Sequence, residues 1–186
     1  MIVAAFDFDG TLTRRDSFVP FLYRYVGPAL TTRGLVAAAK ARGGRSGRKL
    51  AMVSRTIAGR HVDEVAAAGQ AYADRLVDRL RPDTRGALEN HQSTGHKTVI
   101  VTASPELYVG PVGELLGVDA VLGTRFEVDD EGRLTGRYDG RNCRGEEKVR
   151  RLDHWIDGRE VQLLYAYGDS AGDDALLARA DVPTRV

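Results

Sequence analysis

The sequence predicts an α/β protein: an open parallel sheet covered by helices, with an all-helical insert after the first strand and a small β-hairpin. Three observations lead to this fold class. Short runs that are apolar throughout alternate with helical patterns, as in parallel sheets covered on both faces. The long stretch after the first run carries only helical patterns. A later stretch has the pattern of two short strands around a turn.

The expected sheet strands are short and rich in Val, Ile and aromatic residues. The helix expected after the insert has Pro82 and Asp83 in its first turn, where both residue types are favoured. The next helix is ended by Gly117. The strands are expected at residues 2–6, 98–101 and 161–167, with a weaker candidate at 118–122, and the helices at residues 82–91, 105–116 and 146–156.

The stretch between the first strand and residue 82 has no strand pattern. Its first helix carries apolar residues at the spacing i, i+3, i+4 and i+7 (Phe18, Phe21, Leu22, Tyr25) and is broken by Gly27-Pro28. An alanine-rich stretch, a glycine-rich loop and two more helices are expected at residues 35–41, 43–47, 49–58 and 62–80. We therefore expect two domains, a core of residues 1–13 plus 82–186 and a helical domain of residues 14–81.

Two short segments depart from the alternation of strands and helices. Residues 125–128 and 133–138 flank the turn sequence Asp-Asp-Glu-Gly at 129–132. This pattern predicts a β-hairpin outside the main sheet.

The composition is that of an ordinary globular protein, with 186 residues, 42% hydrophobic, 28% charged and a net charge of +1. No stretch approaches the ~18–20 apolar residues of a membrane span, and the apolar start is too short for a signal peptide. The single cysteine, Cys143, cannot form an internal disulfide, which favours a reducing compartment. We expect a cytoplasmic protein without a nucleic-acid partner, and the sequence leaves its oligomeric state open.

Charge is unevenly distributed along the chain. Residues 24–60 contain nine Lys and Arg and no Asp or Glu. This basic stretch is interpreted either as a solvated helical surface or as a face that attracts anionic substrates and holds a second anionic group.

Two carboxylates, Asp7 and Asp9, follow the first strand. Because ligands bind at the carboxyl ends of strands in open α/β sheets, we expect both at the active site. Hydrolysis of a phosphomonoester needs a cation to offset its charge, a nucleophile in line and an acid for the leaving oxygen. Asp7 is the predicted nucleophile, and Asp9 the predicted acid and base. Gly10 provides a sharp turn, and we expect Gly10 and Thr11 to contact the substrate.

The ends of the other strands supply the remaining groups. The hydroxyl of Thr102 and the backbone amides of Ala103 and Ser104 are expected to donate to phosphoryl oxygens, with helix capping as the alternative for Ser104. Lys148 lies between the second and last motifs and is expected to hold the phosphoryl group. Asp169 is expected to bind Mg²⁺ with Asp7 and a backbone oxygen of Asp9, and Asp173 is a further candidate ligand or a residue that orients the ligands.

These segments, in this order and spacing, resemble the haloacid dehalogenase-like (HAD) superfamily. The stretches that carry the resemblance are residues 7–13, 101–105, 143–148 and 168–174. The resemblance implies a Rossmann-like core with Asp7 as nucleophile, Asp9 as acid and base, Thr102 and Lys148 as phosphoryl holders and Mg²⁺ on Asp7, Asp9 and Asp169. The insert looks like the C1-type helical cap of the phosphoserine phosphatase-like branch (subfamily IB), and the hairpin is similar to that branch too.

Some positions depart from phosphoserine phosphatases. Those enzymes usually carry Ser-Gly-Gly where this chain has Thr102-Ala103-Ser104, and a Glu at the cap entrance where it has Asp16. Asp16 is interpreted either as a contact to a substrate amine or as a helix cap. The second motif, with Cys143 ahead of Lys148, looks closer to a broader group that includes phosphatidylglycerophosphate phosphatases. The chain ends at Val186, soon after the last motif, and we expect a less supported sheet edge there.

Three functions remain as hypotheses. The first is a Mg²⁺-dependent phosphomonoesterase that acts through an aspartyl-phosphate on a small anionic, phosphoserine-like metabolite. The second is a lipid-phosphate phosphatase in peripheral contact with an anionic membrane, which the basic stretch favours. The third is a non-catalytic phosphate-sensing protein similar to a receiver domain.

Overall fold

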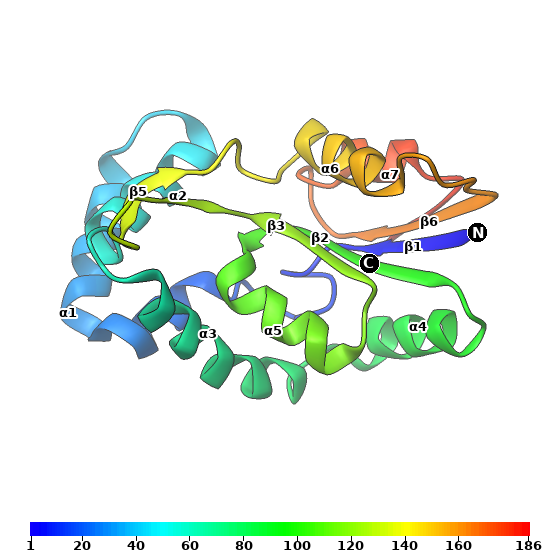
Figure 1. The fold of residues 1–186 in the computed structure, drawn as a ribbon, viewed down its shortest axis with the longest axis horizontal. Coiled ribbons are helices and arrows are strands. Elements are labelled where there is room, and N and C mark those ends of the chain that lie inside the picture. The colour runs from blue at the N-terminus through cyan, green and yellow to red at the C-terminus, as the bar shows by residue number, and fades with distance from the viewer.

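A computed structural model describes residues 1–186 and contains a parallel sheet with helices on both faces (Figure 1). Its five strands lie in the order β3-β2-β1-β6-β7, and every neighbouring pair is parallel. The strands are β1 (Ile2–Phe6), β2 (Lys97–Pro105), β3 (Ala120–Thr124), β6 (Leu163–Gly168) and β7 (Val182–Arg185). The predicted α/β class is confirmed.

Side chains of the central strand β1 alternate between two cores. Phe6 belongs to the cluster that includes Leu88 of α4 (Pro82–Ser93) and Tyr108 of α5 (Glu106–Leu116). Val3, pointing the other way, packs with Leu152 of α6 (Glu146–Ile156) and with α7 (Asp174–Arg179). In Figure 1 these two helix pairs lie on opposite faces of the sheet. Burial on both faces explains why the strand is apolar throughout.

The insert forms three helices at one end of the sheet (Figure 1): α1 (Phe18–Lys40), α2 (Gly44–Thr56) and α3 (Val62–Val77). The break expected at Gly27-Pro28 is a kink within α1, where Gly27 has φ 79° and ψ 171°. The loop expected at residues 43–47 is wrong in extent, because α2 already begins at Gly44. Gly43 makes the turn with φ 93° and accepts a hydrogen bond from the Gly47 amide at 3.1 Å.

The predicted hairpin consists of β4 (Phe126–Val128) and β5 (Leu134–Tyr138), which pair antiparallel. It packs against α2, as Figure 1 shows for β5. At Gly136 the two backbones approach so closely that a Cβ atom would lie 3.1 Å from the Ser54 Cα. The hairpin therefore connects the helical insert to the chain that leads into α6. No helix has both the length and the apolar character needed to cross a bilayer.

Candidate active site

The carboxyl ends of β1, β2 and β6 meet at a cavity of about 450 Å³ that α1 and α2 close from the other side. The sequence separation of its lining residues exceeds 160 positions, so only the parallel topology brings them together. The predicted site residues that line it are Asp7, Asp9, Gly10, Asp16, Thr102, Ala103, Ser104, Lys148, Asp169 and Asp173.

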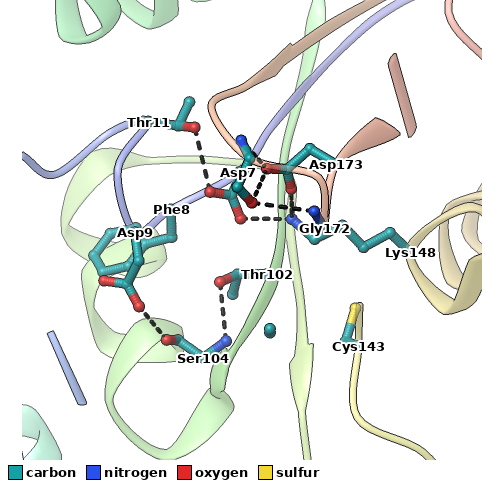
Figure 2. Close-up of polar contacts among 12 residues, drawn as sticks. Asp7, Phe8, Asp9, Thr11, Thr102, Ser104, Cys143, Lys148, Gly172 and Asp173 are labelled. Carbon is teal, nitrogen blue, oxygen red and sulfur yellow. Dashed lines mark hydrogen bonds and ion pairs between the residues drawn. The ribbon is translucent and has the colours of Figure 1, made fainter. Parts of the chain in front are cut away.

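Asp7 lies at the centre of this group, directly after β1. Lys148 Nζ donates to Asp7 Oδ1 at 2.5 Å, and Thr11 Oγ1 donates to Asp7 Oδ2 at 3.2 Å (Figure 2). Burial raises the pKa of Asp7 to about 6, against the lowering effect of Lys148. The carboxylate is thus fixed in orientation at both oxygens.

Lys148 is buried between two carboxylates. Its Nζ also donates to Asp173 Oδ1 at 2.6 Å, and its side chain is 1% exposed. Burial opposes its charge, but attraction to Asp7 and Asp173 outweighs burial and keeps the pKa of Lys148 above its ordinary value. Burial alone would raise the pKa of Asp173, but Lys148 holds this pKa below its ordinary value. One ammonium group is therefore shared by two carboxylates, and Asp7 keeps a raised pKa.

The donor set fits a hard divalent cation. Carboxylate oxygens of Asp7, Asp169 and Asp173 lie within 4.8 Å of one another, and Asp169 Oδ1 is buried without a hydrogen-bond partner. An unpartnered buried carboxylate oxygen is costly unless a cation or water satisfies it. Oxygen-only donors favour Mg²⁺ over softer metals. The Asp9 carboxylate lies outside this cluster, so a contribution from its backbone oxygen stays a prediction.

Gly10 leaves room for the Asp169 carboxylate at the cluster. Its φ of 93° is unfavourable for other residues, and a Cβ atom at this position would collide with the Asp169 carboxylate. The sharp turn predicted here thus also makes room for a candidate metal ligand.

Asp9 points away from the cluster, toward the insert. Figure 2 shows its carboxylate turned toward Ser104, whose hydroxyl donates to Oδ2. The Ser17 amide, at the start of α1, donates to Oδ1 at 2.9 Å. Burial, with a contribution from Asp16, raises the pKa of Asp9. A raised pKa suits a group that carries a proton to a leaving oxygen.

The turn after Thr102 supplies the opposite wall. Thr102 is buried, and its Oγ1 accepts a hydrogen bond from the Ser104 amide at 3.0 Å. The Ala103 carbonyl accepts from Thr124 Oγ1 at 2.8 Å and from Lys49 Nζ at 2.5 Å. The Ser104 side chain binds Asp9 and makes no cap hydrogen bond to α5. Ser104 therefore belongs to the site by contact.

Two predicted substrate contacts change in the structure. Thr11 does not line the cavity: it is fully buried, and its hydroxyl orients Asp7, because the turn at Gly10 points its side chain into the protein. Asp16 lines the cavity and also caps α1, since its Oδ1 accepts from the Phe18 amide at 3.1 Å. The hydrogen bond to Phe18 thus supports the interpretation of Asp16 as a helix cap. A contact between Asp16 and a substrate stays a prediction.

Apart from Lys148, none of the basic residues that line the cavity was predicted as a site residue, and two of them stand out by their contacts. Lys49 reaches from α2 to Ala103, and Arg144 lines the wall beside Gly172. Lys49 is one of nine bases in a helical stretch, and no local pattern distinguishes it from solvated neighbours. Arg144 lies in the motif that contains Lys148. This position was the only signal in the sequence that could have identified Arg144 as a site residue.

Known proteins match the chain along most of its length. A family model described as haloacid dehalogenase-like hydrolase matches residues 4–178. The protein CicA of Caulobacter vibrioides is 41% identical over 187 residues, which cover 97% of this chain and 83% of CicA. A histidinol-phosphatase of Neisseria meningitidis serogroup C is 31% identical over 119 residues, 61% of this chain and 54% of that protein.

A solved phosphoserine phosphatase has the same fold. The structure, a phospho-aspartyl intermediate analogue of that enzyme, matches with a TM-score of 0.65 and 21% identity. The match covers 99% of this chain and 85% of that one. At this identity the likeness concerns the fold alone.

Proposed function

Because the chain belongs to the haloacid dehalogenase-like hydrolase family and is a phosphatase of its phosphoserine phosphatase-like branch, we propose that it hydrolyses phosphomonoesters of small anionic metabolites through a phosphorylated Asp7. The observation that carries this proposal is the Asp7 carboxylate, held by Lys148 and Thr11 at the floor of the cavity. Membership in a hydrolase family argues against the receiver-like, non-catalytic alternative.

The proposed reaction has two steps. The Asp7 carboxylate attacks phosphorus, the bond to the leaving oxygen breaks, and Asp9 gives that oxygen its proton. Asp9 then takes a proton from a water molecule, which attacks the aspartyl-phosphate and releases inorganic phosphate and free Asp7. Lys148 neutralises part of the phosphoryl charge, and the turn at Thr102 offers its hydroxyl and the following amides to phosphoryl oxygens.

The cluster of Asp7, Asp169 and Asp173 is proposed to hold Mg²⁺, with a backbone oxygen of Asp9 as a further ligand. When bound, the cation supplies charge that offsets the phosphoryl oxygens during in-line attack. Asp173 has less freedom to ligate than Asp169, because its two oxygens accept from Lys148 and from Ser170, whereas Asp169 Oδ1 has no partner. We propose that its main role is to position Lys148.

Residues 14–81 are proposed as the cap domain that covers the site. Support comes from Lys49, Arg45 and Arg48 of α2, which line the cavity together with residues of the core. The hairpin of β4 and β5 packs against α2, and we propose that it belongs to the same covering structure over the site.

Trapping of the intermediate tests this proposal. We expect acid quenching during turnover with Mg²⁺ and p-nitrophenyl phosphate to leave a phosphoryl mass increment on the peptide that contains Asp7. The increment should be absent in Asp7→Asn, and excess chelator should stop turnover until Mg²⁺ is restored. Unchanged turnover of Asp7→Asn would require direct attack by water instead.

A second candidate function is hydrolysis of a lipid phosphate at an anionic membrane surface. The observation that favours it is an outward face of α1 where the exposed apolar residues Leu35 and Val36 neighbour Arg33 and Lys40, which have no acidic partner. Such a face suits contact with anionic headgroups. Flotation with vesicles of phosphatidylglycerol at low and high salt tests it, and no binding at low salt would contradict it.

A further inference from the structure

The arginines that line the cavity have no partner within the protein. None of the five forms a side-chain hydrogen bond or an ion pair, whereas arginines elsewhere commonly pair with acids, as in Arg85–Glu89 and Arg179–Asp153. A set of unpaired guanidinium groups around one cavity is a site for anions. The five are Arg14, Arg15, Arg45, Arg48 and Arg144.

Three hydrogen bonds hold the arginine-bearing end of α2 against the core. Tyr138 OH donates to the Ser46 carbonyl at 2.9 Å, and Asn142 Nδ2 donates to Ser46 Oγ at 2.7 Å. Lys49 Nζ donates to the Ala103 carbonyl at 2.5 Å. Arg45 and Arg48 thus sit on a segment fixed over the site, which distinguishes them from arginines on a freely solvated helix face.

Arg144 approaches from the core side, in the loop that also carries Asn142. An added Cβ atom at Gly172 would lie 3.1 Å from Arg144 Nε, which places this guanidinium beside the loop that carries Asp169 and Asp173, in the lining of the same cavity. Arg45 is close enough to Asp169 to lower the pKa of that carboxyl, although burial raises it overall. The cavity therefore has guanidinium groups on both its core and its α2 walls.

The carboxylates of the cavity are already engaged. Asp7 and Asp173 share Lys148, and Asp9 accepts from Ser17 and Ser104. Asp16 accepts from amides of the first turn of α1. Asp169 is the exception, because its Oδ1 has no hydrogen-bond partner, but it belongs to the cluster proposed to hold the cation and is therefore not free to bind a substrate ammonium group.

We propose that the substrate carries, besides the phosphate that is hydrolysed, a second oxyanion that Arg45 and Arg48 bind. This inference rests on the proposed phosphatase activity and specifies its substrate class: a phosphomonoester linked to a carboxylate or to another phosphate, without an ammonium group beside it. The planar guanidinium fork matches both kinds of oxyanion.

A matched substrate series tests this class. Propyl phosphate is the neutral reference, and it is compared with analogues that end in a carboxylate, a second phosphate or an ammonium group, on three- and five-carbon chains. We expect kcat/KM for at least one oxyanion analogue to exceed that of the neutral reference about 10- to 100-fold, the range of charge-assisted hydrogen bonds. The carboxylate and phosphate arms identify which oxyanion is preferred, and the ammonium analogue should be the poorest.

The double variant Arg45→Gln/Arg48→Gln should reduce this ratio to near one. Arg55→Gln, an exposed arginine of the same helix that does not line the cavity, is the matched control and should keep the wild-type ratio. A ratio below about two for both linker lengths, preference for the ammonium analogue, or an unaltered ratio in the double variant would overturn the inference. Lack of activity on every phosphomonoester would overturn the proposed function itself, and the inference with it.

Discussion

Replacing Lys148 by Met should expose the electrostatic strain of the cluster. Lys148 is 1% exposed and lies 2.5 Å from Asp7 and 2.6 Å from Asp173. Methionine has a similar length and no charge, so the variant leaves two buried carboxylates without their cation while changing packing little. Removing one partner of a buried ion pair costs about 3–5 kcal/mol. For a chain of this size the melting temperature should fall by roughly 6–20 °C.

Urea unfolding in the presence of chelator measures this cost. Lys97→Met is the matched control. Lys97 Nζ lies 2.6 Å from Asp119 Oδ1, nearly the same distance as in the Lys148 pairs, but the Lys97 side chain is 51% exposed. We expect the control to lose no more than about 1 kcal/mol. The double variant Lys148→Met/Asp173→Asn should be more stable than the sum of its single changes, since one repelling carboxylate is gone.

Added Mg²⁺ separates charge from packing in the same experiment. If the cluster binds the cation, Mg²⁺ should stabilise Lys148→Met more than the wild type, because the variant has more unneutralised carboxylate. A loss of stability in Lys148→Met no larger than that of Lys97→Met would refute the reasoning. Equal stabilisation of variant and wild type by Mg²⁺ would refute the assignment of the cation to this cluster.

Three further changes test neighbouring parts of the structure. Asp9→Asn should lower kcat roughly 10²–10⁴-fold, the usual effect of losing an acid and base, and a smaller loss would contradict that role. Gly10→Ala should raise the Mg²⁺ concentration needed for activity because its Cβ displaces Asp169, whereas Gly95→Ala, also at positive φ but in open space, should not. Burial lowers the pKa of His91 from its ordinary 6.5, so the unfolded chain takes up the proton first and the free energy of unfolding should fall below about pH 6.5. His91→Gln should flatten that fall between pH 7.5 and 5.5 in urea unfolding, and an unchanged slope would show that another group is responsible.

The sequence was sufficient for the parts of the fold that depend on local pattern. The strands around Asp7, Thr102 and Asp169 are apolar runs, and each polar residue follows its run directly, so parallel topology alone predicts that these residues meet. The strand β7 was missed because it is four residues long and contains Pro183, which an edge strand tolerates.

Contacts between the helical insert and the core could not be predicted from local pattern. Lys49 and Ser46 of α2 meet Ala103 and Asn142 of the core only because α2 packs against the hairpin and the loop before α6. The direction of the Thr11 side chain depends on the turn at Gly10. The sequence indicates the positive φ of Gly10, but it does not indicate where the turn directs the next side chain. The cluster residues follow from the motifs, whereas the other residues that line the cavity depend on packing in three dimensions.

Chemistry and selectivity are carried by different sets of contacts. Every partner of Lys148 and Asp7 lies in the core, and attraction to two carboxylates keeps the pKa of Lys148 above its ordinary value despite burial. Lys49 contacts a carbonyl oxygen instead, and burial lowers its pKa. Because the contacts that place Arg45 and Arg48 all run between α2 and the core, substitutions in α2 should act on substrate choice, and substitutions in the cluster should act on turnover and stability.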